Sequence, residues 1–437
     1  MAQDMNLLQL TVEQRAQAMA VFGECADLRE FGCRMLEAVM NAVMDADAQD
    51  ACGAARGERS EARENSRNGY RPRTLRTAAG DLELAIPKLR RGTYYPEGIL
   101  GRYTRVEASM VALVREMYVA GVSTRKVERV AEALGVSSLS SSEVSRLCSE
   151  LDESAAAFRS RPIEGDSPYV WLDATYMKCQ VDGRYASQAL VTAIGLGADG
   201  RKRFLGAECV DAESRESWRA FLEGLRARGL SGVRLVVSDA HAGLVAAVRE
   251  VFCGCSWQRC VTHLQRDLQG RVRTRAGKAA CAELVRLATT QADATLARAV
   301  WDEAQPWVAA LSPAAGEAFG EAREDALAFM AFPREHWAKI RTNNQQERAN
   351  REIKRRYRSV QSFPSRASMM RLTCAVLMGE EGRWQAQRLL SPSSLAKAAP
   401  SAAEPPSEER LEAARLYAAE AVREVVDRRG LRKSFYR

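Results

Sequence analysis

The stretch Tyr169-Val-Trp-Leu-Asp-Ala-Thr-Tyr-Met-Lys-Cys179 predicts a β-strand that carries one carboxylate inside an apolar run. Alternation along this strand places Trp171, Asp173 and Thr175 on one face and mainly apolar side chains on the other. A carboxylate in an apolar strand is costly unless it is paired or binds a cation. Asp173 is therefore a candidate functional residue.

The residues that follow predict an α/β core. Two strands, a helix, a strand and a helix are expected in turn over residues 185–195, 201–210, 214–228, 233–238 and 242–251. A meander of three strands followed by parallel crossovers is the order with which the ribonuclease-H-like fold begins. Residues 265–335 are rich in Ala and helical throughout, so they predict an all-α insertion before the α/β pattern resumes near Phe332.

Two further carboxylates occupy positions that such a sheet could bring near Asp173. Asp239 follows the strand 233–238 directly, at the end of a strand where ligands usually bind, although an N-cap of the next helix would explain it equally. Glu347 lies in the basic segment 341–358. If that segment is a helix, it carries five polar side chains on one face, namely Asn343, Glu347, Asn350, Arg351 and Lys354. A surface pair of Glu347 with Arg351 is the alternative explanation.

Together, two Asp and one Glu supply the hard oxygen ligands that Mg²⁺ prefers, with Mn²⁺ as a substitute. Two such ions activate the attacking oxygen and stabilise the leaving oxygen in phosphoryl transfer, and nearby cations would hold a polyanion. Asp173, Asp239 and Glu347 are therefore predicted to be both catalytic and metal-binding.

A second group of possible ligands lies between the two halves of the core. Cys260 and His263 form a Cys-x-x-His element, and with Cys253 and Cys255 they could make a Cys3His zinc set. The spacing is irregular, and both earlier cysteines suit a buried strand. We expect no structural zinc, and we assign Cys260 and His263 to support of the active site.

The first part of the chain predicts helices and a basic segment. Residues 5–50 have helical periodicity that suits a packing or dimerising layer. Residues 53–76 carry seven Arg against three Glu and turn-forming residues around Gly69, which suits phosphate contact or a solvated linker; a short edge strand over 81–87 follows. Two helices joined by a Gly-containing turn within 105–151 predict a helix-turn-helix, although a plain helical hairpin makes the same pattern.

Composition narrows the class of protein. The 437 residues hold 64 Lys and Arg against 56 Asp and Glu, a net charge of +8 that fits a polyanionic partner without proving one. No apolar run reaches the roughly 20 residues of a membrane span, and no signal peptide is evident. Eleven scattered Cys and only three His indicate reduced thiols in a cytoplasmic protein and argue against a multi-histidine metal centre.

A series of motifs runs in order from about residue 53 to residue 390. They are Arg67-Asn-Gly-Tyr-Arg71, Ile86-Pro-Lys-Leu-Arg90, Gly121-Val-Ser-Thr-Arg125, Val144-Ser-Arg-Leu-Cys148, Leu172-Asp-Ala-Thr-Tyr176, Ser238-Asp-Ala-His-Ala-Gly-Leu244, Trp257-Gln-Arg-Cys-x-x-His263, and Phe332-Pro-Arg-Glu-His-Trp337 leading into Ile340-Arg-Thr-Asn-Asn-x-x-Glu-Arg-x-Asn350. In this order they resemble the Mutator-type transposases of bacterial insertion sequences, the insertion-sequence-256 family.

The resemblance implies a ribonuclease-H-like core with a DDE triad, and Asp173, Asp239 and Glu347 fall on its three positions. Cys260 and His263 match the family's Cys-or-Asp-x-x-His element, and Lys354 matches a basic residue that related recombinases place against DNA. Gln345 and Gln346 stand where an apolar pair or Pro is more usual. The implied activity is Mg²⁺-dependent cleavage at the ends of an insertion sequence, followed by strand transfer into target DNA.

The implied partners are the terminal inverted repeats and target DNA, bound by a homodimer or larger assembly that is cytoplasmic and associated with the nucleoid. No membrane and no small-molecule cofactor are expected. Contacts with DNA are expected from Arg67, Tyr70, Arg71, Arg125, Ser142, Ser145, Arg146, Arg351, Lys354 and Arg355. Three alternatives remain. They are a DNA-binding regulator, a structure-selective nuclease of the same fold that joins no strands, and a zinc-stabilised interaction module.

We expect seven segments along the chain. They are a helical region at 1–52, a basic segment with a short strand at 53–100, a helix-turn-helix region at 101–164, the first part of the catalytic core at 165–264, the helical insertion at 265–335, the second part of the core with the Glu helix at 336–390, and a linker and helix at 391–437.

Overall fold

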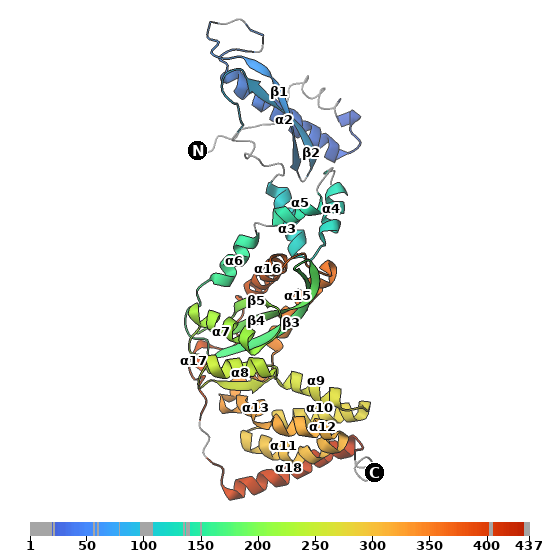
Figure 1. Cartoon of the computed structure of the whole chain (residues 1–437), viewed down its shortest axis with the longest axis vertical. Helices are drawn as coiled ribbons and strands as arrows, with labels where there is room; N and C mark the ends of the chain where they lie inside the picture. The colour runs from blue at the N-terminus through green and yellow to red at the C-terminus, as the bar shows by residue number, and fades with distance from the viewer. Residues whose placement is uncertain are drawn as a thin grey trace. The chain divides into compact units, whose positions relative to one another are not determined.

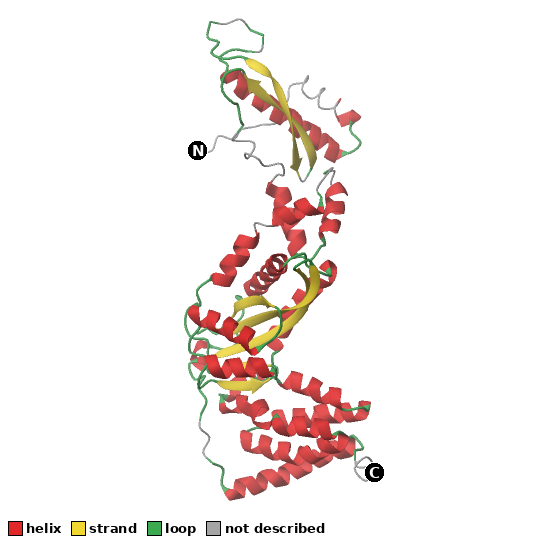
Figure 2. Cartoon of the chain, in the orientation of Figure 1, coloured by secondary structure: helices red, strands yellow, loops and turns green. Residues whose placement is uncertain are grey.

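The computed structural model describes residues 20, 22–55, 57–58, 61–77, 79–96, 108–133, 136, 140–148, 151–401 and 405–431. They divide into two compact units, residues 1–150 and 151–437, each of which is described by itself (Figures 1 and 2). The seven expected segments are a finer division and stay a prediction. The helical periodicity expected over residues 5–19 and the turn at Gly135 lie outside the described residues.

The first unit combines a β-hairpin with helices. Its elements are α2 Leu28–Asp50, β1 Arg67–Thr77, β2 Gly80–Leu89, α3 Ala108–Val119, α4 Thr124–Ala133 and α5 Ser141–Leu147. Helix α2 packs on the hairpin through Met44, which lies in one buried cluster with Leu75, Leu82, Leu84 and Ile86. Alternate residues of β2 are buried, as expected for a strand with one covered face.

The hairpin differs from the expected loop and short strand. Asn68-Gly69 does not form a turn; the pairing register shifts between Arg67 and Tyr70, and Gly69 has a φ of 78°, so this dipeptide makes a bulge inside β1. Strand β2 also continues through Pro87, which pairs with Tyr70. Pro is tolerated there because both strands of a two-stranded sheet have an open edge.

Helices α3, α4 and α5 pack against one another. Helix α5 begins at Ser141, where a helix was expected, and Ser140 caps it. The Ser140 hydroxyl accepts from the Glu143 N–H, while the Glu143 carboxylate accepts from the Ser140 N–H. Glu143 also pairs with Arg76 of β1 at 2.8 Å, so α5 is tied to the hairpin within this unit.

The second unit contains a five-stranded mixed sheet. Its strands are β3 Tyr169–Val181, β4 Arg184–Leu196, β5 Lys202–Val210, β6 Leu235–Ser238 and β7 Ser256–Arg259. Their order in the sheet is β5-β4-β3-β6-β7; β5, β4 and β3 are antiparallel neighbours, and β6 and β7 continue the sheet in parallel. The expected meander and α/β crossover are confirmed. Strand β7 was not predicted.

Helices cover both faces of this sheet (Figure 1). The helices are α6 Leu151–Ser160, α7 Arg215–Ala227, α8 Ala242–Val251, α9 Val261–Arg271, α10 Arg275–Thr289, α11 Ala294–Leu311, α12 Pro313–Glu321, α13 Arg323–Leu327, α14 Trp337–Ile340, α15 Asn344–Val360, α16 Arg366–Trp384, α17 Pro392–Leu395 and α18 Glu408–Arg428, with 3₁₀ turns η2 Ala328–Ala331 and η3 Arg334–His336. Val170 and Leu172 of β3 share a core cluster with Trp218 of α7 and Leu244 of α8. The opposite face of β3 carries Asp173, as the alternation predicts.

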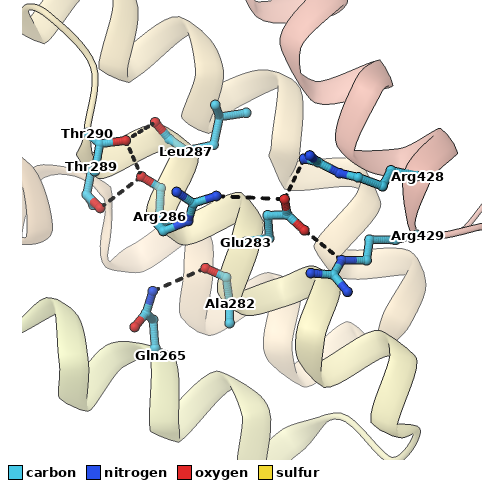
Figure 3. Close-up of polar contacts among 9 residues, drawn as sticks. All are labelled: Gln265, Ala282, Glu283, Arg286, Leu287, Thr289, Thr290, Arg428 and Arg429. Atoms are coloured by element: carbon cyan, nitrogen blue, oxygen red, sulfur yellow. Dashed lines mark hydrogen bonds and ion pairs between the residues drawn. The ribbon is translucent and has the colours of Figure 1, made fainter.

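Helices α9 to α13 form the expected all-α region, and α18 packs along α10 and α11. Arg428 and Arg429 at the end of α18 both bind the buried carboxylate of Glu283 on α10 (Figure 3). None of the helices among the described residues is both long enough and apolar enough to cross a membrane.

Residues 391–406 were expected to be a linker because of their Ser, Pro and Ala content. The structure instead places the short helix α17 in this segment, with Leu395 and Ala398 buried. The Ser394 hydroxyl lies 2.8 Å from Nε2 of His336 and donates to Glu335 at 2.9 Å. This part of the segment is therefore attached to the α/β unit by specific contacts.

Candidate active site

The candidate site lies where α15 packs along β3. Strand β3 pairs with β6 only from Tyr169 to Trp171, so the residues beyond have an edge without a β6 partner. Asn343, just before α15, donates from Nδ2 to the Leu172 carbonyl at 2.9 Å. Farther along, the Tyr357 hydroxyl accepts from the Lys178 N–H at 2.6 Å. Side chains at helical spacing thus fix the helix along the strand.

The fully buried Gln346 makes three hydrogen bonds to the sheet. Its Nε2 donates to the carbonyls of Trp171 at 2.8 Å and Thr192 at 3.1 Å, and its Oε1 accepts from the Thr192 hydroxyl at 3.2 Å. One side chain therefore joins α15 to two neighbouring strands. These contacts hold α15 at the residue directly before Glu347.

Asp173 is buried on the α15 face of β3. Its Oδ2 accepts from Asn350 Nδ2 at 2.5 Å, and its Oδ1 accepts from the Ala174 N–H at 3.1 Å. Burial, followed by the negative charge of Asp239, raises the pKa of Asp173 to about 7. Two neighbouring carboxylates, one of them buried, repel each other when both are ionised. A bound divalent cation lowers this electrostatic cost, because it stabilises both negative charges.

Asp239 directly follows β6 and is half-buried. The competing explanation as a helix N-cap is wrong, because the N-cap of α8 is His241, whose ring accepts from the Leu244 N–H. The charge of Asp239 also acts on His263, whose pKa is nevertheless lowered by burial. Asp239 and His263 line a hollow of about 420 Å³ beside β6 and α9, to which Arg259 and Arg271 contribute positive charge.

Glu347 lies in the first turn of α15, and its partner is not Arg351. Arg266 of α9 places Nη2 2.9 Å from Glu347 Oε1, with the two side chains 59% and 27% exposed. The charge of Glu347 acts on His263, and the charge of Lys354 acts on both His263 and Asp173. All three predicted carboxylates therefore belong to one electrostatic neighbourhood.

Cys260 and His263 frame the start of α9. Cys260 is buried, and its Sγ accepts from the Asn343 N–H at 3.1 Å, which connects α9 with the start of α15. Burial raises the pKa of this thiol. Cys253, for which a buried strand was one interpretation, is instead exposed in a turn, and its thiol donates to the Glu250 carbonyl.

Within the described part of the chain, no three or more His, Cys, Asp or Glu side chains are grouped so that they could hold a metal ion. The donor types nevertheless suit Mg²⁺ or Mn²⁺, since Asp173 and Asp239 already influence each other and Glu347 is nearby. Glu347 would have to leave Arg266 to join them. The metal-binding assignment of the triad stays a prediction.

The residues expected to contact DNA have different surroundings. Arg67 and Tyr70 both bind Asp45 of α2, at 2.8 and 3.0 Å, so they also pack the hairpin onto that helix. Arg355 pairs with Glu352 at 3.2 Å. Exposed side chains are those of Arg71, Arg125, Ser142, Arg146, Arg351, Lys354 and Arg355. The structure does not describe the Ser145 side chain. All ten assignments stay predictions.

Sequence reasoning did not assign a site role to Asn350, Gln346 or Arg266. Asn350 was placed on the Glu347 face, but its bond to Asp173 joins residues far apart in the chain. Gln346 was noted only as a departure from an apolar position. The one available signal for Arg266 was its place three residues after His263, at the start of the predicted helical region 265–335.

Comparison with known proteins identifies similar chains. The family model described as "Transposase, Mutator family" matches residues 5–387. The transposase for insertion sequence element IS1081 of Mycobacterium tuberculosis is 42% identical over 360 residues, covering 80% of this chain and 84% of the relative. The transposase for ISRM5 of Rhizobium meliloti is 38% identical over 365 residues, 83% of this chain and 90% of that one. The transposase for IS256 in transposon Tn4001 of Staphylococcus aureus is 35% identical over 357 residues, 80% and 90% respectively.

Proposed function

The chain belongs to the Mutator family of transposases, and we propose that it is a DDE transposase whose carboxylates are Asp173, Asp239 and Glu347. In this proposal it cuts DNA at the ends of an insertion sequence and joins the freed 3′ end to target DNA. The observation that carries it is the docking of α15 on β3, which brings the Glu347 helix to the buried Asp173. The strand order β5-β4-β3-β6-β7 supports a ribonuclease-H-like core.

Asp173 and Asp239 would hold the divalent ions, Mg²⁺ or Mn²⁺, and Glu347 would complete the site. When bound, such ions activate the attacking oxygen and stabilise the leaving oxygen of an in-line displacement. Asn350 keeps Asp173 Oδ2 oriented by its hydrogen bond, so the carboxylate does not have to reorient. Lys354 adds positive charge beside Asp173 that would favour a bound phosphate backbone.

For DNA recognition we propose that α4 and α5 form a helix-turn-helix that binds the terminal inverted repeats. The support is the packing of α3, α4 and α5 and the exposed Arg125, Ser142 and Arg146. Arg71 of the hairpin is exposed and would contact phosphate. We also propose that two or more copies assemble on DNA, in the nucleoid of the cytoplasm, because two ends of an element have to be joined.

The test uses the full chain with a labelled duplex that contains an end of its own element. With Mg²⁺ the wild type should nick at the end and join a pre-cut 3′-OH strand to a second duplex. Asp173→Asn, Asp239→Asn and Glu347→Gln should lose both products and keep DNA binding. Asp302→Asn, which changes an exposed carboxylate on α11, is the matched control and should keep them.

The alternatives give different results in the same assay. DNA binding without Mg²⁺-dependent cleavage by the wild type would identify a regulator. Cleavage without joining of the pre-cut strand would identify a nuclease. Cleavage and joining that survive in all three carboxylate variants would refute the assignment of the triad.

A further inference from the structure

The ion pair between Arg266 and Glu347 links two elements of the proposed site. Arg266 lies on α9, one turn after His263, and its Nη2 is 2.9 Å from Glu347 Oε1. Arg266 is 59% exposed, whereas Glu347 is only 27% exposed. The guanidinium therefore covers a carboxylate that faces the site while remaining accessible to solvent itself.

The position of α9 is fixed by contacts on both sides of the site. The Cys260 N–H donates to the Ser238 carbonyl at 2.8 Å, immediately before Asp239, and the Val261 N–H donates to the Arg341 carbonyl at 3.1 Å. Gln265, next to Arg266, donates from Nε2 to the Ala282 carbonyl of α10 at 3.1 Å (Figure 3). These contacts fix both the start and the flank of α9. The backbone position from which Arg266 extends toward Glu347 is therefore determined by the fold.

Two chemical demands compete at this pair. A divalent cation and a guanidinium that share one carboxylate repel each other, since two positive charges then lie side by side. A guanidinium, in turn, binds a phosphate through two parallel hydrogen bonds and is well suited to a DNA backbone. The pair can therefore exchange both partners at once when a metal ion and DNA enter the site.

We propose that Arg266 is a DNA-phosphate ligand that serves as the counter-ion of Glu347 until metal ions and DNA replace this contact. This inference rests on the proposed transposase function and adds a residue to its DNA-binding set. The exchange is easy because the Arg266 guanidinium is mostly exposed, so that water screens the pair, and the pair lowers metal affinity by no more than about fivefold. The released side chain offers its charge beside the hollow at Asp239 and His263, where Arg259 and Arg271 already lie.

The first measurement leaves DNA out. Mn²⁺ is titrated into the full chain and binding is followed by calorimetry, with folding checked by thermal unfolding. Arg266→Ala should bind Mn²⁺ up to about fivefold more tightly than the wild type. The matched control is Arg298→Ala, which removes an exposed partner of Glu324 at 3.0 Å on the insertion and should leave Mn²⁺ affinity unchanged. In a Glu347→Gln background, Arg266→Ala should no longer alter Mn²⁺ affinity.

The second measurement uses a labelled terminal-repeat duplex over a range of salt concentrations. Arg266→Ala should reduce the slope of log affinity against log salt by about one, as expected for one lost phosphate contact. Arg266→Lys keeps the charge and should retain most of the slope. An unchanged slope in Arg266→Ala, or Mn²⁺ binding no tighter than that of the wild type, would overturn the inference.

The two proposals fail in different ways. If the wild type binds Mn²⁺ and cuts DNA while Arg266→Ala matches it in both titrations, only the role of Arg266 is refuted. If the wild type neither binds Mn²⁺ nor cuts DNA, the proposed function is refuted and the inference falls with it.

Discussion

Replacing Gln346 by leucine should weaken the attachment of α15 to the sheet without leaving a large cavity. The side chain is fully buried and makes three hydrogen bonds, two to main-chain carbonyls and one from the Thr192 hydroxyl. At about 1 kcal/mol for each bond, their loss costs about 3 kcal/mol. The greater apolar surface of leucine offsets about 1 kcal/mol of this loss. The expected net destabilisation is therefore about 2 kcal/mol.

Gln345→Leu is the matched control for this change. It makes the same chemical substitution one position earlier, at a side chain that is only partly buried and that makes no side-chain hydrogen bond to the described part of the chain. Thermal unfolding of the full chain should show the transition of the second unit lowered by about 4 °C in Gln346→Leu and by less than 1 °C in Gln345→Leu. Amide exchange should be faster along α15 in Gln346→Leu alone, because the opening is local.

Activity provides the second part of this test. If the Gln346 contacts position Glu347, DNA cleavage at a temperature where both variants are folded should fall in Gln346→Leu and not in Gln345→Leu. Equal stability and equal exchange along α15 in the two variants would refute the reasoning, because the three buried bonds would then contribute nothing measurable.

Two further predictions concern contacts remote from the triad. His336 is buried between the Tyr169 hydroxyl and Ser394, and burial lowers its pKa against the opposing charge of Glu335. Its neutral form is therefore the stable one, so stability should fall as the pH drops below about 6.5 toward the folded-state pKa, and His336→Gln should flatten this slope in pH-dependent unfolding. Glu283→Ala removes the shared partner of Arg428 and Arg429. Because both guanidiniums are about half exposed, we expect the attachment of α18 to lose only about 2 kcal/mol of stability. Limited proteolysis before α18 should then quicken by up to roughly thirtyfold.

The elements of the α/β unit could be predicted because their signals are local. Alternation along β3 placed Asp173 opposite the apolar face, and the structure confirms that Val170 and Leu172 pack in the core. Periodicity also gave β4, β5, β6, α7 and α8 to within a few residues. Strand β7 is as short as β6, but Ser256–Arg259 holds a single apolar residue, Trp257, whereas β6 is a continuous apolar run up to Ser238; β7 therefore has no local signal that distinguishes it from a loop.

Two segments contain structure that their composition did not indicate, because composition reports only local backbone preference. Asn68-Gly69 suits a turn, but pairing of β1 with β2 and the contacts of Arg67 and Tyr70 with Asp45 turn it into a bulge. The Ser- and Pro-rich residues after 390 suit a linker, but Ser394 bonds to His336. In both cases the deciding partner lies on a different element, so no window of sequence contains it.

The face of α15 shows how far sequence reasoning about a site can go. Helical spacing correctly grouped Asn343 and Asn350, but only the sheet decides which part of that face is buried. Because β3 extends past its ladder with β6, the groups it leaves unpaired need donors and acceptors from outside the sheet, and a helix with an apolar face could not supply them. The hydrogen bonds to these main-chain groups come from Asn343, Gln346 and Tyr357. Asn350 donates in the same way to the Asp173 carboxylate. Glu347 then falls at the border of the buried face, next to Gln346, where it can reach both α9 and the site. The same polar contacts that complete the fold therefore determine where the third carboxylate stands.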